Sequence, residues 1–183
     1  THITLKDEPV FITYQHAVMQ YAKLDPFSAS DDEIKALGID LAGNDLRLNR
    51  DGWLDMIMSH KVEKCLPQNQ LVFIYNYPAS QAALSKLNYD ESGQLISERF
   101  EVYLNGLELA NGYHELTDSD EQRARFEKEL STTENMKDRP IDEKLLTAMS
   151  DEEGLPDCAG VAMGIDRILM LQLGLKKIAE VIS

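Results

Sequence analysis

Cysteine and long apolar runs are both scarce in this 183-residue chain. The two cysteines, Cys65 and Cys158, lie far apart without a CxxC motif, so neither a structural metal site nor a disulfide framework is expected, and both are interpreted as reduced core thiols. No stretch approaches the roughly 18 to 20 apolar residues that span a bilayer, and residues 1–4 show no basic-then-apolar signal region. These absences predict a soluble, cytoplasmic protein without a membrane partner.

The chain also has few basic residues. Lys and Arg number 18 against 32 Asp and Glu, and the formal net charge is −14. No dense Lys/Arg run occurs, which argues against capture of nucleic acid by charge. The chain also has no GxxxxGK[ST] P-loop, and its glycine spacing does not match the dinucleotide-binding fingerprint.

What the sequence does contain is a mixture of helical and strand periodicities. Helices are predicted by apolar spacing and capping residues at 13–24, 51–66, 117–130, 140–149 and 166–173, and the polar stretch 28–50 suits a short helix and loops. Strands are predicted by short β-branched or aromatic runs at 71–77, 97–104, 107–113 and 158–165. With 43% hydrophobic residues, these elements predict one α+β domain.

A β-hairpin around Asn105-Gly106 is the clearest local feature, because this dipeptide favours a two-residue type I′ turn. The register then pairs Leu104 with Leu107, Tyr103 with Glu108 and Glu101 with Ala110. Strand alternation assigns an apolar face, expected to be the core, to Phe100, Val102, Leu104, Leu107 and Leu109. It assigns a polar face to Arg99, Glu101, Tyr103 and Glu108.

Two carboxylates on the polar face suggest a metal site. Glu101 and Glu108 are diagonal neighbours within about 7 Å or less, so one hard cation such as Mg²⁺ could lie between them. The alternative is a solvated sheet face on which two glutamates merely coexist.

A third carboxylate, Glu115, lies seven residues beyond Glu108. An odd spacing reverses the face of a regular strand, so Glu115 joins the same cavity only if the strand is bulged, and we expect that bulge at Asn111-Gly112. His114 is a candidate base or ligand, with a packing or hydrogen-bonding role as the alternative.

The segment 160–167 places Gly160 and Gly164 in or beside a strand, where glycine is costly unless something approaches the backbone closely. A flat ring such as adenine would provide that reason. Asp166 could cap the following helix, and Arg167 in its first turn could bind a phosphate. The alternative is a glycine bulge followed by a surface arginine.

These two blocks, 98–116 and 160–167, together resemble the C-terminal half of the class II lysyl-tRNA synthetase catalytic domain. The glycine-rich strand and arginine-bearing helix are similar to motif 3 of that class. The Glu-Leu-Ala-Asn-Gly, Tyr-His-Glu-Leu and Pro-Asp-Cys-Ala-Gly stretches further resemble the elongation factor P–lysine ligase group, which lacks the anticodon-binding domain. The implied fold is an antiparallel sheet with flanking helices.

The resemblance implies a set of nucleotide contacts. Glu108 and Leu109 would contact ATP, Glu101 and Glu108 would hold Mg²⁺, and Gly164 would underlie the adenine. Arg167 would grip the triphosphate as a catalytic residue.

The resemblance also implies how the amino acid is bound. Glu115 would receive the amino group of a lysine-type substrate, and Asn111 would help to place it. Ala162 stands where lysyl-tRNA synthetases usually have glycine. Its additional methyl group would reshape the amino-acid pocket in favour of (R)-β-lysine.

The implied activity is that of a ligase: ATP-dependent formation of an aminoacyl-adenylate and transfer to a lysine side chain of elongation factor P, without tRNA. Motifs 1 and 2, which build the dimer interface and part of the active site, are not visible in residues 1–183. The chain is therefore expected to be the C-terminal part of a single catalytic domain, inactive alone and homodimeric when complete. A lysyl-tRNA synthetase that charges tRNA and a non-catalytic interaction module remain as alternatives.

Overall fold

The computed structural model describes residues 5–6, 8–43, 46–132, 140–150 and 154–182. Its strands are β1 (Val10–Thr13), β2 (Leu71–Pro78), β3 (Leu87–Tyr89), β4 (Leu95–Leu104), β5 (Leu107–His114) and β6 (Ala159–Met163). Its helices are α1 (Tyr14–Ala22), α2 (Asp31–Ala42), α3 (Arg50–Ile57), α4 (Glu63–Cys65), α5 (Ser119–Thr132), α6 (Glu143–Ser150) and α7 (Ile165–Leu173). Short π-helical and 3₁₀ segments are η1 (Met58–Val62), η2 (Ala79–Gln81) and η4 (Ile178–Glu180). The predicted α+β class is confirmed.

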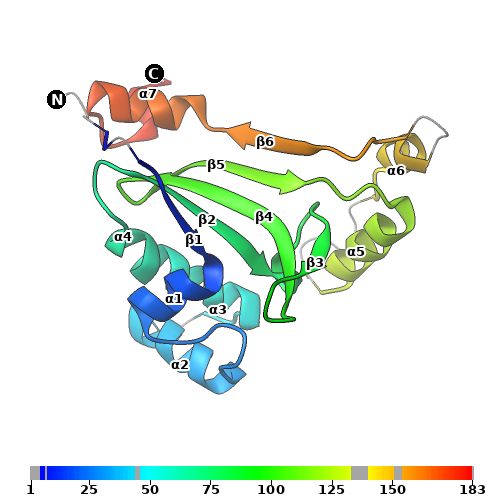
Figure 1. Ribbon diagram of the computed structural model, residues 1–183, viewed down its shortest axis with the longest axis horizontal. Helices are drawn as coiled ribbons and strands as arrows, with labels where there is room; N and C mark the ends of the chain where they lie inside the picture. The colour runs from blue at the N-terminus through cyan, green and yellow to red at the C-terminus, as the bar shows by residue number, and fades with distance from the viewer. Residues whose placement is uncertain (1–4, 7, 44–45, 133–139, 151–153, 183) are drawn as a thin grey trace.

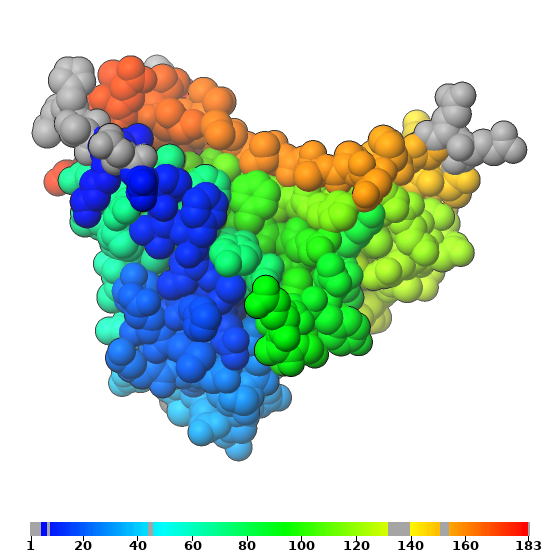
Figure 2. Space-filling view, in the orientation of Figure 1, coloured from blue at the N-terminus to red at the C-terminus, as the bar shows by residue number. Residues whose placement is uncertain are grey.

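One sheet organises the chain, with strand order β1-β2-β4-β5-β6 and β3 paired to β4. β1 and β2 are parallel, and the other pairs are antiparallel. Helices α1 to α4 lie against one face at the β1–β2 end, whereas α5 and α6 lie together at another end of the sheet (Figure 1). β6 and α7 run along one border of the molecule (Figure 2). Helices therefore cover the β5–β6 end of the sheet less than the β1–β2 end.

The hydrophobic core lies between the sheet and helices α1 to α4. Its helix residues include Tyr14, Val18, Ile34, Leu54 and Ile57, and its strand residues are Val72, Ile74, Tyr77 and Tyr103. The buried helix side chains recur at the helical spacing expected from the sequence. Burying one face of each helix is favourable, by about 25 cal/mol for each Å² of apolar surface removed from water.

The hairpin turn is confirmed, but its expected core face is wrong. Asn105 and Gly106 have φ of 55° and 75°, and Leu104 pairs with Leu107 and Tyr103 with Glu108 as predicted. The helices, however, cover the face of Glu101 and Tyr103. Of the five residues expected in the core, Leu104 and Leu109 are buried, whereas Phe100, Val102 and Leu107 stay half-buried. Phe11, Phe73 and Phe100 form a row of rings on the other face. The pattern of apolar residues in the hairpin does not show which of its two faces the helices cover.

A bulge at Asn76 changes the direction of side chains in β2. Tyr75 pairs with Phe100, whereas Tyr77 pairs with Ser97, so two residues of β4, Glu98 and Arg99, lie opposite the single residue Asn76, which has φ of 58°. Asparagine is among the few residues that tolerate this left-handed conformation. The bulge turns Tyr77 toward the helices instead of toward the side of Tyr75.

The cysteines do not lie in the core as expected. Cys65 is exposed, Cys158 is half-buried, and both are free thiols. Around Cys65 the buried positions are Val62 and Leu66 instead. Within the described ranges, no helix combines the length and apolarity needed to cross a membrane.

Replacement of Gly112 by alanine should destabilise the sheet. A Cβ atom at Gly112 would lie 2.5 Å from ring atoms of Phe100 and 2.8 Å from the backbone oxygen of Gly160, which cannot move without disturbing the β5–β6 pairing. We expect Gly112→Ala to lower the free energy of unfolding by about 1 to 3 kcal/mol, as measured by urea denaturation. Gly164→Ala is the matched control, because its Cβ would meet only the Arg167 side chain, at 3.4 Å or more. Equal losses in both variants would contradict the steric explanation.

Candidate active site

A groove of about 990 Å³ opens on the helix-covered side of the sheet. Glu101 and Glu108 line it from the hairpin. Carboxylates from α3 and α4 line it as well, namely Asp51, Asp55 and Glu63. The groove is therefore strongly acidic and suits a cationic ligand.

Three of the predicted site residues form one row across the sheet. Glu101 of β4 pairs with Asn111 of β5, and Asn111 pairs with Ala162 of β6. Glu108 lies in the adjacent row, opposite Tyr103. Paired residues project on the same face of a sheet, so strand pairing brings together residues that lie up to 61 positions apart in the sequence.

The predicted bulge exists, but at Leu109 instead of Asn111-Gly112. Val102 pairs with Ala110 and Tyr103 with Glu108, so Leu109 is the additional residue in β5, and Glu101 lies opposite Asn111 instead of Ala110. The bulge reverses the alternation after Glu108, as the argument for Glu115 required. The expected position was wrong because a glycine or asparagine is not obligatory at a bulge.

Glu115 lies on the same face, directly over Gly160. A Cβ atom at Gly160 would clash with Oε1 of Glu115. The close approach that explains this glycine is therefore made by a carboxylate of the chain itself, and adenine is not needed to explain it. Gly160 allows Glu115 to lie flat against β6.

Glu101 is the most constrained carboxylate of the groove and is only 7% exposed. The Tyr77 hydroxyl donates to its Oε2 over 2.6 Å, Tyr103 donates to the same oxygen, and Arg99 donates to Oε1. Burial, then Tyr103 and Glu101, raises the pKa of Tyr77 well above its usual value, so this hydroxyl keeps its proton. The sequence does not point to these partners, because a tyrosine on a strand gives no sign of what its hydroxyl contacts.

The expected nucleotide contacts lie where β5, β6 and α7 meet. Arg167 donates to the Glu108 carbonyl over 2.7 Å and to its Oε2 over 3.3 Å. The carbonyl of Leu109, which is itself buried, accepts the Gly164 N–H over 2.9 Å. α7 begins at Ile165 with Gly164 as its N-cap, so Asp166 lies within the first turn and is not the predicted cap.

The acidic residues of the helices were not expected at the site. Burial, followed by Glu101 and Glu108, raises the pKa of Glu63, and burial followed by Asp51 raises the pKa of Asp55. Asp51 and Asp55 have the i, i+4 spacing of one helix face, which the sequence does show. Their position opposite the hairpin depends on tertiary packing alone.

The carboxylates of Glu101 and Glu108 could supply some, but not all, of the ligands of a Mg²⁺ ion. A carboxylate offers about four acceptor positions. Glu101 uses three of them, whereas the Glu108 carboxylate accepts a hydrogen bond only from Arg167 among the described residues. Among the described residues, no group of three or more His, Cys, Asp or Glu side chains is arranged to hold a metal ion. Mg²⁺ usually takes only one or two carboxylates together with substrate phosphates, so the pair is compatible with such a site.

One buried acceptor near these carboxylates lacks a donor. Oδ1 of Asn111 is buried and has no hydrogen-bond partner among the residues that the structure describes. An unpaired buried acceptor costs about 1 to 3 kcal/mol. A bound ammonium group would satisfy it.

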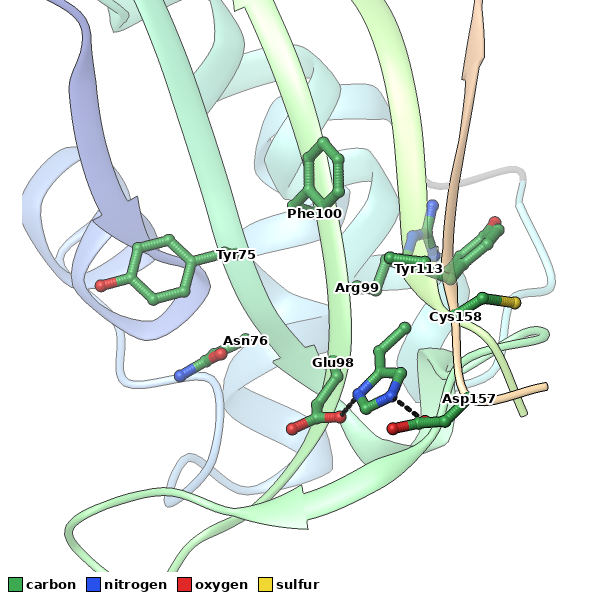
Figure 3. A pocket seen from close by; sticks show the side chains of 10 residues that line it. Tyr75, Asn76, Glu98, Arg99, Phe100, Tyr113, Asp157 and Cys158 are labelled. Carbon is green, nitrogen blue, oxygen red and sulfur yellow. Dashed lines mark hydrogen bonds and ion pairs between the residues drawn. The ribbon is translucent and has the colours of Figure 1, made fainter. Parts of the chain in front are cut away.

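His114 lies on the opposite face, beside a separate cavity of about 590 Å³. Glu98 and Asp157 also line this cavity (Figure 3). Its Nδ1 is 2.5 Å from Oε2 of Glu98, and its Nε2 is 2.6 Å from Oδ1 of Asp157. Lys86 also binds Asp157. The hydrogen-bonding interpretation of His114 is confirmed, and His114 does not reach the groove.

Residues 5–183 match the family model described as tRNA synthetases class II (D, K and N). The chain belongs to this class II tRNA synthetase family. Relatives named elongation factor P–(R)-β-lysine ligase, from Proteus mirabilis (strain HI4320), Klebsiella pneumoniae subsp. pneumoniae and Klebsiella pneumoniae (strain 342), are each 41% identical over 177 residues. The alignments cover 94% of this chain and 53% of each relative, so the chain spans about half their length. The class II synthetase fold inferred from the two sequence blocks is thereby confirmed.

The contacts of His114 predict a pH-dependent stability for this family member. Hydrogen bonds with Asp157 and then Glu98 raise the pKa of His114, because both ring nitrogens must donate. The stabilisation is complete below the ordinary histidine value of about 6.5 and is lost as the pH rises through the raised value. We expect the difference in unfolding free energy between the original chain and His114→Gln to be largest near about pH 6 and to shrink by about pH 9.

Urea denaturation at several pH values measures this difference. His16→Gln, on the exposed side of α1, is the control and should show no such pH dependence. A constant difference for His114→Gln would contradict the doubly hydrogen-bonded imidazolium.

Proposed function

We propose that the protein containing this chain activates (R)-β-lysine or lysine with ATP as an aminoacyl-adenylate and transfers it to a lysine side chain of elongation factor P. The observation that carries this proposal is the gathering of Glu101, Glu108, Asn111, Glu115 and Ala162 on one face of the sheet. The names of the three relatives support the substrate and the acceptor. The proposal includes the cytoplasmic location and homodimeric state expected from the resemblance.

The part of the same sheet face that carries Glu115 and Asn111 supplies negative charge for an amine. Glu115 offers a carboxylate over Gly160, and Asn111 offers the unpaired Oδ1. A carboxylate and an amide oxygen are both acceptors, so they select an ammonium group and orient it. The amino-acid carboxylate is thereby positioned for attack on the α-phosphorus of ATP.

The nucleotide side supplies a fixed cation and carboxylates. Arg167 is about two-fifths exposed and is oriented by Glu108, so the rest of its guanidinium can face a phosphate. Glu101 and Glu108 would hold Mg²⁺, which neutralises triphosphate charge when bound. Attack on the α-phosphorus forms the adenylate and releases pyrophosphate. The acceptor amine then attacks the adenylate carbonyl, an amide bond forms, and AMP leaves with the bonding electrons.

Pyrophosphate exchange and acceptor labelling test the proposed function in the intact protein. We expect exchange with a lysine-type amino acid, and transfer of labelled amino acid to elongation factor P but not to tRNA. Glu108→Gln should lower exchange by about 10²-fold or more, because it removes one fixed charge at nearly constant shape.

Glu91→Gln, in the exposed turn between β3 and β4, is the control and should exchange normally. Labelling of tRNA would favour a lysyl-tRNA synthetase instead. Absence of exchange in the unaltered protein would favour a non-catalytic module. Normal exchange by Glu108→Gln would remove Glu108 from the nucleotide site.

Ala162→Gly should change the choice of amino acid. Ala162 is aligned with Asn111, so its methyl group lies on the face proposed to bind the substrate. We expect a shift toward lysine of about tenfold or more in relative kcat/KM, since one methyl group is worth about 1 to 3 kcal/mol in such a pocket. Ala159→Gly is the matched control, because Ala159 pairs with His114 on the opposite face of the same strand. If the ratio of the two kcat/KM values stays the same in Ala162→Gly, Ala162 does not set specificity.

A further inference from the structure

Two tyrosines of β2 occupy opposite faces of the sheet, although they lie two positions apart. In a regular strand, Tyr75 and Tyr77 would share a face. Asn76 lies opposite both Glu98 and Arg99 and has a left-handed backbone, which breaks the alternation, so Tyr75 lies beside the cavity of the open face (Figure 3), while Tyr77 lines the acidic groove and is 3% exposed. The bulge therefore determines which tyrosine reaches Glu101.

Tyr77 is held on three sides. Its hydroxyl donates to Oε2 of Glu101 over 2.6 Å. The Arg99 guanidinium carbon lies 4.7 Å from the centre of its ring, and the ring centre of Tyr14 lies 4.8 Å away. A side chain packed between two rigid neighbours has little rotamer freedom, so its hydroxyl stays at one point in space.

We propose that Tyr77 is a positioning residue for the Glu101 carboxylate and thereby sets the affinity of the groove for Mg²⁺. This inference rests on the proposed function. With Tyr77 and Tyr103 on Oε2 and Arg99 on Oε1, the carboxylate is fixed in one plane, with one acceptor position remaining. Groups that orient a metal ligand typically change metal affinity by about 10- to 100-fold when they are removed.

A competing interpretation is that Tyr77 only fills space in the core. Tyr77→Phe separates the two, because it keeps the ring and removes only the hydroxyl. Tyr75→Phe is the matched control: it makes the same chemical change on the same strand but on the other face. The Arg99 contact with the ring is preserved in both variants.

The experiment measures two properties of the intact protein. The first is the Mg²⁺ concentration that gives half-maximal pyrophosphate exchange, and the second is the affinity for Mn²⁺ in the presence of ATP, measured by electron paramagnetic resonance. For Tyr77→Phe we expect about a tenfold higher Mg²⁺ requirement and about a tenfold weaker Mn²⁺ affinity, with kcat at saturating Mg²⁺ little changed. Tyr75→Phe should leave both properties unchanged.

An unchanged Mn²⁺ affinity in folded Tyr77→Phe would overturn the proposal, and so would equal changes in Tyr75→Phe. If Tyr77→Phe does not fold, Tyr103→Phe removes the second donor to the same oxygen and should weaken Mn²⁺ binding similarly; unchanged binding there overturns the proposal. Absence of exchange in the unaltered protein, with the Mn²⁺ contrast intact, would refute the proposed activity and leave the role of Tyr77 standing.

Discussion

The burial of the Glu101 charge is the constraint on which the rest of the site depends. An unpaired carboxylate in a protein interior costs several kcal/mol, and this cost is offset only by close, well-oriented partners. Arg99 and Tyr103 provide those partners from the same strand, β4, and Tyr77 provides one from the neighbouring β2. The groove can therefore keep a charged group against a hydrophobic core, within reach of a substrate.

Two irregularities in the sheet serve this arrangement. The bulge at Asn76 turns Tyr77 toward Glu101, and the bulge at Leu109 turns Glu115 to the face that already holds Glu108. At the first, two residues of β4 lie opposite the left-handed Asn76, and at the second, Leu109 is an additional residue of β5; each reverses the side-chain alternation beyond it. Regular strands would have divided these polar groups between two faces.

The two faces of the sheet have separate electrostatics. On the groove side, burial and then neighbouring like charges raise the pKa of Glu63 and Asp55, so ionising them there is costly and a cationic ligand would relieve that cost. On the opposite side, two acids, Glu98 and Asp157, pair with His114 and Lys86. These ion pairs tie Asp157, two residues before β6, to β5 and, through His114, to β4. The residues that stabilise the open face by ion pairing are therefore different from the carboxylates that give the groove its negative charge.

The sequence by itself determined the α+β class, the hairpin turn and most helices, because helical periodicity and Asn-Gly chemistry are local properties. It also identified Glu101, Glu108, Asn111, Glu115 and Ala162, which the structure gathers on one face, and it required a bulge before Glu115. Tertiary structure alone decided which face the helices cover, where the bulges lie, and that Tyr77, Asp55 and Glu63 join the groove. These features depend on contacts between residues far apart in the chain, which no local pattern encodes.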